Sequence, residues 1–141
     1  MDKKAVINTL NRIMELELAG VVRYTHYSLM IYGYNRIPIV DWLEKQADES
    51  LGHARQAGEL VTWLCGHPSL AIGAMLETHK HDIGDILKES LEHEKEALKA
   101  YYDLFALVEH KDIRLEEYAR NMIATEVAHS DEVEKMLRKP A

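Results

Sequence analysis

The sequence contains a single cysteine, Cys65, among 141 residues, so no disulfide can form within one chain. Unpaired thiols are typical of reducing compartments, and we therefore expect a cytoplasmic protein. The start of the chain lacks the charged segment and apolar run of a secretion signal. No run of roughly 18 apolar residues is present, which excludes a membrane-spanning helix.

Helix-breaking residues are also scarce, with three prolines and seven glycines in the whole chain. The prolines (Pro38, Pro68 and Pro140) lie far apart. Proline inside a helix removes a hydrogen bond and clashes with the preceding turn. The wide spacing therefore leaves long stretches in which nothing prevents a continuous helix.

Basic residues are too few and too scattered to bind a nucleic acid. The chain has 17 Lys and Arg against 24 Asp and Glu, a formal net charge of −7. Contacts with phosphates require clustered Lys and Arg, so we expect no nucleic-acid partner. An acidic surface does attract metal cations.

Apolar residues recur at steps of three or four over four segments, which is the period of an amphipathic helix. The expected helices cover approximately residues 2–34, 39–65, 82–109 and 113–137. The irregular stretch 69–82 is long for a connection inside a compact bundle. We predict that it crosses from one end of the bundle to the other, so that the second and third helices run parallel. The fold class expected for residues 1–141 is a single all-α four-helix domain.

Each apolar stripe is interrupted by a polar residue. Glu17 interrupts the first stripe and Glu94 the third, Glu126 and His129 interrupt the fourth, and His53 lies on the second. A buried carboxylate without a partner costs several kcal/mol or becomes protonated. The simplest explanation shared by four helices is a cation bound between them.

The spacing of Glu126 and His129 indicates what kind of cation is bound. Residues three apart on a helix share one face, so both side chains can reach neighbouring metal ions. Carboxylate plus imidazole suits iron or manganese. One Glu from each of two helices, with a Glu-x-x-His pair from each of the other two, is the ligand pattern of a di-iron bundle. Glu17 and Glu94 provide the single glutamates.

The second helix provides only part of this pattern, because Ser50 rather than Glu stands three residues before His53. Glu49 stands four residues before His53, about 100° around the helix from Ser50. We predict that Glu49 is the substitute ligand, brought inward by a rotation of the helix or a one-residue bulge. The alternative, a solvated surface glutamate, is equally open.

Tyr24 and the two histidines of the expected loop each allow two interpretations. Tyr24 either packs in the core or hydrogen-bonds a metal-bound carboxylate. His79 and His81 resemble a metal-binding tract, but they lie in an expected loop, where histidines are commonly solvated. His93 points about 100° away from Glu94, and we expect it outside the site.

Together these residues resemble bacterioferritins, within the ferritin-like superfamily, over nearly the whole chain. Residues 10–24 resemble the first helix of that family, with an iron-binding Glu17 followed by a core Tyr24. His53-Ala54 resembles the second helix, residues 83–94 resemble the approach to the third-helix glutamate, and residues 126–129 match the fourth-helix motif. The resemblance implies that Glu17 and Glu126 each bind one metal or bridge two. It also implies that His53 and His129 each hold one iron and that Glu94 is a terminal or bridging ligand.

Three departures from the family pattern limit what the resemblance implies. Ser50 stands where the family has a bridging Glu, and Leu51 stands where it has the haem-binding Met, so no haem is expected. Only twelve residues follow His129, which leaves no room for the short fifth helix of bacterioferritins. A dimer and a cage of a different kind therefore both stay open.

The resemblance implies a ferroxidase that binds two iron ions per chain. Fe(II) is oxidised to Fe(III), with oxygen or hydrogen peroxide as the electron acceptor, in a homo-oligomer built from dimers that stores and detoxifies iron. One alternative is a di-metal oxidase or peroxide-reducing enzyme without a storage shell. Another is a non-catalytic bundle with a degenerate site, which only Ser50 supports. A DNA-protecting miniferritin is disfavoured, because the chain is acidic and lacks that group's intersubunit ligands.

Overall fold

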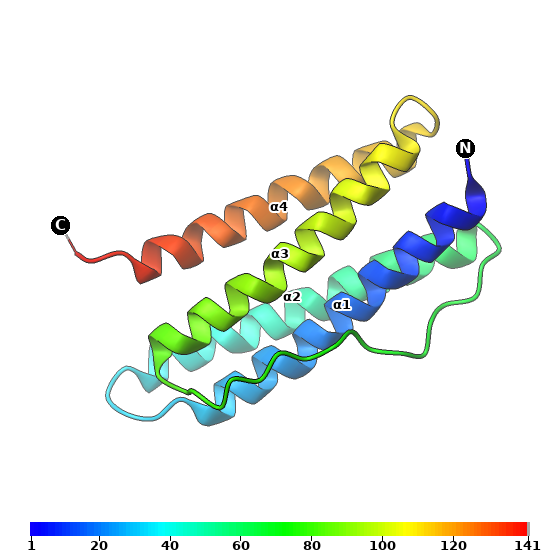
Figure 1. The fold of residues 1–141 in the computed structure, drawn as a ribbon. Helices are drawn as coiled ribbons and strands as arrows, with labels where there is room; N and C mark the ends of the chain where they lie inside the picture. Colours follow the sequence, from blue (N-terminus) through cyan, green and yellow to red (C-terminus); the bar gives the residue numbers. More distant parts are fainter. Residues whose placement is uncertain (141) are drawn as a thin grey trace.

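The computed structural model describes residues 1–140 and consists of four long helices. Their bounds are Lys3–Met30 for α1, Arg36–Trp63 for α2, Ile83–Val108 for α3 and Ile113–Leu137 for α4. The pairs α1/α2 and α3/α4 are antiparallel hairpins, and the chain between them runs back along the bundle, so that α2 and α3 point the same way (Figure 1). The predicted all-α bundle with a long crossover is confirmed. No fifth helix follows α4 within residues 1–140.

Side chains at the helix starts fix where α1 and α4 begin. Asp2 accepts a hydrogen bond from Ala5 N at 3.1 Å, and Asp112 accepts one from Leu115 N at 2.9 Å. Each bond satisfies a backbone donor that has no partner inside the helix. A carboxylate also interacts favourably with the positive end of the helix dipole.

The first helix is shorter than predicted and ends at Met30 instead of near Tyr34. Gly33 has a φ of 97°, in the left-handed region that favours glycine, and it turns the chain toward α2. Arg36 stabilises the end of α1 by donating hydrogen bonds to Ser28 O at 3.0 Å and Ile31 O at 2.7 Å. The apparent continuation to Tyr34 is therefore a turn.

The second helix is displaced toward the N-terminus relative to the prediction, from 39–65 to Arg36–Trp63. Pro38 lies in the first turn, where a backbone N–H has no helical partner to lose. At the other end the left-handed residue is Cys65, with φ of 63°, and Gly66 N donates to Val61 O at 2.8 Å. Gly66 is needed for close packing, because a Cβ there would lie 2.8 Å from the side chain of Ile7.

The crossover is bound to α3 by buried side chains. Leu76 N donates to His93 Nε2 at 3.0 Å, and Thr78 N donates to Glu89 Oε1 at 2.8 Å. Backbone groups of a connection need such partners wherever water is excluded. His93 therefore holds the crossover, and its side chain does not line the central pocket described below.

Two apolar clusters fill the bundle, one on each side of a polar band. The larger lies toward the start of α1 and contains Leu10, Ile13, Val61, Leu104, Leu115 and others. The smaller lies toward the end of α1 and contains Tyr24, Tyr27, Ile31, Leu43, Ala47 and Ile86. Within residues 1–140 no helix combines the length and apolar character required to span a membrane.

The four helices are not equally close. Cα atoms approach within 8 Å between α1 and α2, between α3 and α4, and between α1 and α3, but nowhere between α2 and α4. This wider spacing leaves room for polar side chains that enter the polar band from α2 and α4.

Candidate metal centre

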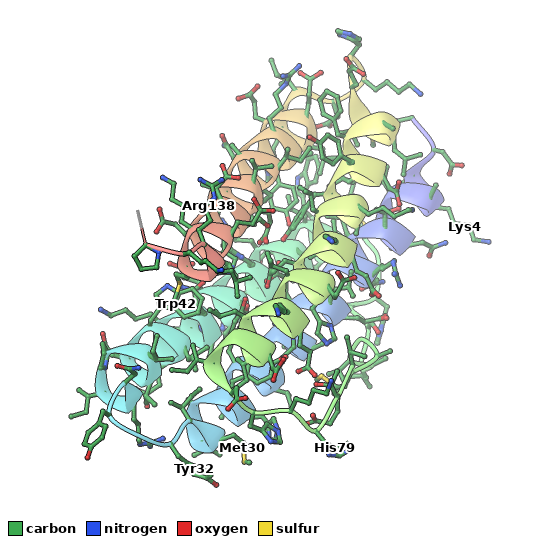
Figure 2. The ribbon with its side chains drawn as sticks, turned by 60° about the vertical axis from the view of Figure 1, so that its left-hand side comes forward. Lys4, Met30, Tyr32, Trp42, His79 and Arg138 are labelled. Carbon is green, nitrogen blue, oxygen red and sulfur yellow. The ribbon has the colours of Figure 1, made fainter. Side chains whose placement is uncertain are left out.

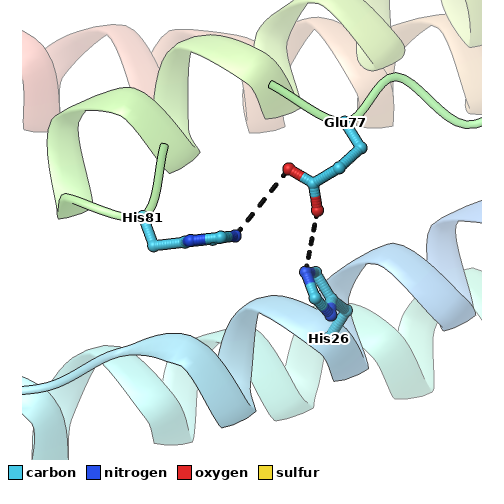
Figure 3. Close-up of side chains that lie close together, drawn as sticks. All are labelled: His26, Glu77 and His81. Atoms are coloured by element: carbon cyan, nitrogen blue, oxygen red, sulfur yellow. Dashed lines mark hydrogen bonds and ion pairs between the residues drawn. The ribbon is translucent and has the colours of Figure 1, made fainter. Parts of the chain in front are cut away.

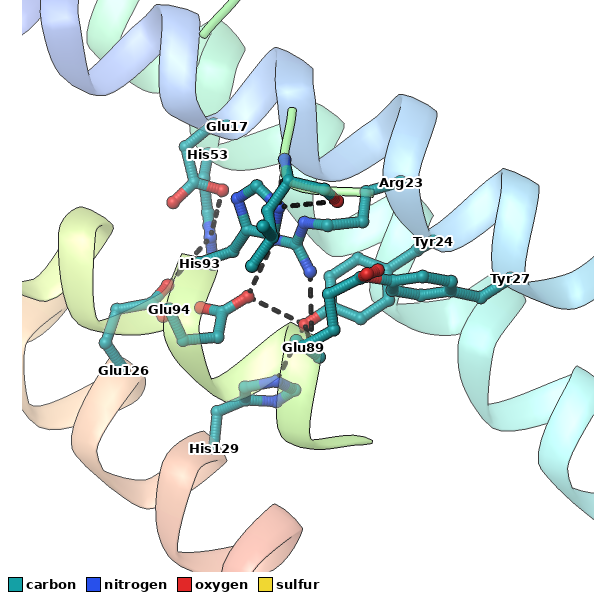
Figure 4. Close-up of polar contacts among 12 residues, drawn as sticks. Glu17, Arg23, Tyr24, Tyr27, His53, Glu89, His93, Glu94, Glu126 and His129 are labelled. Atoms are coloured by element: carbon teal, nitrogen blue, oxygen red, sulfur yellow. Dashed lines mark hydrogen bonds and ion pairs between the residues drawn. The ribbon is translucent and has the colours of Figure 1, made fainter. Parts of the chain in front are cut away.

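Three of the predicted ligands converge from three helices. His53 Nδ1 lies 3.4 Å from Glu17 Oε2 and 3.8 Å from Glu126 Oε1, and the three ligand atoms lie within 4.8 Å of one another (Figure 4). Tyr101 donates a hydrogen bond to Glu17 Oε1 at 3.0 Å, which holds that carboxylate toward the centre. Glu17 and Glu126 are only 5% and 4% exposed.

The other two predicted ligands meet at the hydroxyl group of Tyr24. The Tyr24 hydroxyl lies 2.7 Å from Glu94 Oε1 and 3.0 Å from His129 Nε2, and Ser90 Oγ lies 3.0 Å from the same hydroxyl. The structure contains both interpretations of Tyr24: its ring packs in the smaller apolar cluster, and its hydroxyl group donates a hydrogen bond to a candidate ligand, Glu94.

The Tyr24 network determines which nitrogen of His129 is available. A phenol hydroxyl has one proton to donate and two lone pairs that accept. If the proton goes to Glu94, which as a carboxylate only accepts, then Ser90 and His129 Nε2–H must both donate to Tyr24. His129 Nδ1 then carries the lone pair that can bind a metal. Metal-binding histidines commonly use their second nitrogen in this way.

Arg23 is a buried cation that sequence reasoning missed. Its Nη2 lies 3.3 Å from Glu94 Oε1, and its Nη1 donates to Ser90 Oγ at 3.2 Å. Its guanidinium group also lies over the ring of Tyr24. Arg23 is displaced around α1 from the stripe that carries Glu17, and its long side chain reaches the site sideways. The only signal in the sequence is its position next to Tyr24.

The charges of Glu94 and Glu126 differ because their surroundings differ. Burial raises the pKa of Glu126, and the carboxylates of Glu94 and Glu17 raise it further. Burial alone would also raise the pKa of Glu94. The contacts with Glu126 and Arg23 together have a larger effect than burial, so the pKa of Glu94 is lowered. Glu126 Oε2 is buried without a hydrogen-bond partner. We therefore expect Glu126 to hold a proton at neutral pH when no metal is bound, and a bound cation would displace that proton.

This proton makes the stability of the metal-free protein depend on pH. An unfolded Glu has a pKa near 4.5, so above that pH only the folded chain holds the proton of Glu126. Unfolding then releases a proton, and the free energy of unfolding falls as pH rises from about 6 to 8, by up to about 1.4 kcal/mol per pH unit. Glu126→Gln should remove this slope and stabilise the metal-free protein at pH 8, as measured by urea denaturation.

The difference between wild type and Glu126→Gln isolates this effect. Burial alone would lower the pKa of His53, but contact with Glu17 outweighs burial and raises it, while burial lowers the pKa of His93. The two pKa shifts change the dependence of the free energy of unfolding on pH in opposite directions. Because wild type and Glu126→Gln both contain the two histidines, the comparison between the proteins reports on Glu126. Parallel stability curves for the two proteins would contradict a proton on Glu126.

Glu49 and Ser50 occupy different positions in a small pocket between α2 and α4. The pocket is lined by Tyr24, Gln46, Glu49, Ser50, His53, Glu94, Thr125, Glu126 and His129. Ser50 is buried, and Glu49 is exposed on a continuous α2 that has no bulge. The Glu49 carboxylate is outside the compact group of Glu17, His53 and Glu126. That Glu49 completes the site stays a prediction.

Ser50 lies against α1 at Gly20. A Cβ on Gly20 would lie 2.8 Å from Ser50 Oγ and 3.7 Å from Arg23 Nη2, so serine and arginine border the same small space. The position expected to carry a bridging glutamate is thus occupied by a neutral hydroxyl beside a cation. The site has one carboxylate fewer and one internal positive charge more than the pattern predicts.

The ligand atoms of the site suit first-row divalent metals such as iron and manganese. Carboxylate oxygens and imidazole nitrogens are ligands of Fe(II) and Mn(II), and the buried, unpartnered Glu126 Oε2 is an acceptor that a cation would satisfy. The pocket has a volume of about 20 Å³ for the centre of a water-sized sphere, which is room for about one water molecule or an ion. The ring of Trp42 stacks parallel to that of His129 at 5.8 Å and shields it.

Comparisons with known proteins identify the family and the fold of the chain. The family model of the ferritin-like domain matches residues 7–141. A ferritin-like, diiron-carboxylate protein from Bacillus anthracis str. Ames has a similar fold, with a TM-score of 0.90 at 23% identity over 98% of this chain and 99% of that one. Rhodobacter capsulatus bacterioferritin, solved with a metal-free dinuclear site and haem iron, has a TM-score of 0.87 at 25% identity over 97% and 85% of the two chains. A search of curated proteins finds no match.

Proposed function

The chain belongs to the ferritin-like domain family, and we propose that it oxidises Fe(II) to Fe(III) at a di-iron centre inside the bundle. The observation that supports the proposal best is the convergence of Glu17, His53 and Glu126 in a buried band, next to Glu94 and His129. Storage and detoxification of iron are the role we propose for this activity.

The two halves of the centre supply ligands to different iron ions. We assign Glu17 and His53 to one Fe(II) and Glu94 and His129 to the other, with Glu126 between them. Anionic oxygen ligands favour Fe(III) over Fe(II), so the same side chains that bind the substrate also favour its oxidation. Two Fe(II) release two electrons, which with two protons reduce dioxygen to hydrogen peroxide, or hydrogen peroxide to water.

Residues around the ligands orient them and limit the access of water. Tyr101 positions Glu17, and Tyr24 positions Glu94 and His129. Fixed ligand orientation of this kind raises metal affinity, and its loss typically costs about 10–100-fold. Glu49 lines the pocket and is exposed to solvent, and we propose that its carboxylate group attracts Fe(II) to the site.

A second candidate function is a single-metal or non-catalytic bundle. Two observations favour it: among residues 1–140 only one compact three-ligand group, Glu17, His53 and Glu126, lies in the polar band, and Glu94 is already paired with Arg23. A second iron would have to displace that ion pair or share Glu94 with it.

The proposed oxidation is tested by adding Fe(II) anaerobically to metal-free protein and mixing it with oxygen or hydrogen peroxide. Ferric absorbance should rise much faster than in buffer alone. Size-exclusion chromatography after loading with excess Fe(II) tests storage. Iron that co-elutes well above two per chain supports storage, whereas a limit of two supports an enzyme without a shell. Oxidation no faster than in buffer would contradict the proposal.

A further inference from the structure

A second group of side chains that could bind a metal ion lies on the outside of the bundle, away from the central pocket. His26 on α1 faces Glu77 and His81, both on the crossover (Figure 3). His26 Nε2 is 3.0 Å from Glu77 Oε2, and His81 Nε2 is 3.7 Å from Glu77 Oε1. The two imidazole rings are 5.7 Å apart, centre to centre. The three ligand atoms lie within 4.8 Å of one another.

This geometry fits a metal ion in size and in ligand type. Ligands about 2.1 Å from a tetrahedral Zn²⁺ lie about 3.4 Å from each other. The two histidine–glutamate distances, 3.0 and 3.7 Å, lie on either side of that value. Two imidazole nitrogens and one carboxylate are a common ligand set for first-row divalent metals with open coordination positions.

His81 provides a second, independent observation. Its Nε2 is buried and has no hydrogen-bond partner, although it points at a carboxylate oxygen beyond hydrogen-bond distance. A buried polar atom without a partner costs about 1–3 kcal/mol. A cation between His81 and Glu77 would give that nitrogen a partner.

The crossover holds Glu77 in place from both sides. The neighbouring backbone groups Leu76 N and Thr78 N donate to His93 and Glu89, two buried side chains of α3. His81 is two residues before α3 begins, and His26 lies within the continuous α1. Ligands fixed in this way lose little conformational entropy when a metal binds.

The neighbouring histidine, His79, does not belong to the group. It is exposed on the crossover (Figure 2) and contacts Glu77 through its backbone N–H, which donates to the carboxylate. His79 also has a left-handed φ of 57°, which Asn tolerates. The sequence predicted that both His79 and His81 are solvated. In the structure only His81 belongs to a group of side chains that could bind a metal ion.

We propose that His26, Glu77 and His81 form a second metal site, which binds one first-row divalent cation and fastens the crossover to α1. The site is separate from the proposed di-iron centre. Its side chains are 43%, 32% and 24% exposed, so a bound ion would keep coordination positions open to water.

Zn²⁺ binding tests the proposal in a protein whose central site is disabled by Glu126→Gln and His129→Ala. Calorimetry should show one Zn²⁺ per chain in this background. Adding His26→Ala or His81→Ala should weaken binding by at least about tenfold, since even partners outside the ligand set are worth that much. Adding His79→Asn, the matched control, should leave binding unchanged. Circular dichroism of the metal-free variants checks that each one folds.

An absence of Zn²⁺ binding in the background, or equal binding after His26→Ala and His81→Ala, would overturn the proposal. Crystals of the background variant soaked in Zn²⁺ give a measurement that needs no further substitution. An anomalous peak within about 2.0–2.2 Å of the three ligand atoms is expected. Zinc only at other positions would also overturn the proposal. Neither result depends on Fe(II) oxidation, because the central site is disabled throughout.

Discussion

Glu126→Gln should slow Fe(II) oxidation by about 100-fold or more, because the residue is the carboxylate that we place between the two iron ions. Even partners outside the ligand set are worth about 10–100-fold in metal affinity or activity. Glutamine keeps the size of the side chain but supplies no negative charge to Fe(III). The measurement is the initial rise of ferric absorbance after an anaerobic Fe(II) complex meets oxygen.

The matched control is Glu132→Gln, which removes an exposed carboxylate from the same helix, α4. It should oxidise Fe(II) at the wild-type rate. His129→Ala should behave like Glu126→Gln, since it removes the imidazole of the same pair. Both site variants should keep their helical circular dichroism. Wild-type rates in both would show that oxidation does not occur at this centre.

Arg23→Met should destabilise the metal-free protein by about 3–5 kcal/mol, the usual cost of removing one partner of a buried ion pair. Arg23 is 6% exposed and Glu94 is 7% exposed, so water cannot replace the guanidinium group. Glu94 would keep its hydrogen bond from Tyr24 but lose the positive charge that helps to keep its pKa low. Urea denaturation in the presence of a chelator measures the loss.

The same variant should gain more stability from metal than the wild type does, because a bound cation replaces the missing positive charge beside Glu94. Binding stabilises a folded protein in proportion to the logarithm of ligand concentration over dissociation constant. The control is Arg12→Met, which removes an exposed arginine from α1 and should change stability little. If metal-free Arg23→Met were as stable as the metal-free wild type, the ion pair between Arg23 and Glu94 would not contribute to the stability of the protein.

The helices and the crossover could be predicted because each follows from a local pattern. The period of apolar residues predicted four helices, and the length of 69–82 predicted the parallel arrangement of α2 and α3. The predictions were wrong at the helix ends, where single contacts determine which residue is the last in the helix. The end of α1 depends on a left-handed Gly33 and on Arg36, whose hydrogen bonds reach back to Ser28 and Ile31.

The sequence predicted the site residues that lie on the apolar face of a helix. It did not predict residues that reach a site from another face of the helix or from the crossover. Glu126 and His129 share a face by spacing alone, whereas Arg23 reaches Glu94 from a different face of α1. The group of His26, Glu77 and His81 depends on where an irregular segment lies on a helix. No periodicity encodes that position, and it became visible only in the structure.

We propose that the bundle holds two iron ions although Ser50 replaces a ligand of the expected pattern. An anaerobic titration of metal-free His26→Ala/His81→Ala protein with Fe(II) tests it most directly, since the proposed outer site is then removed. Two Fe(II) bound per chain is the result that a complete di-iron centre predicts. One Fe(II), or none, would contradict it and would mean that Ser50 and Arg23 have left a single-metal or inactive site.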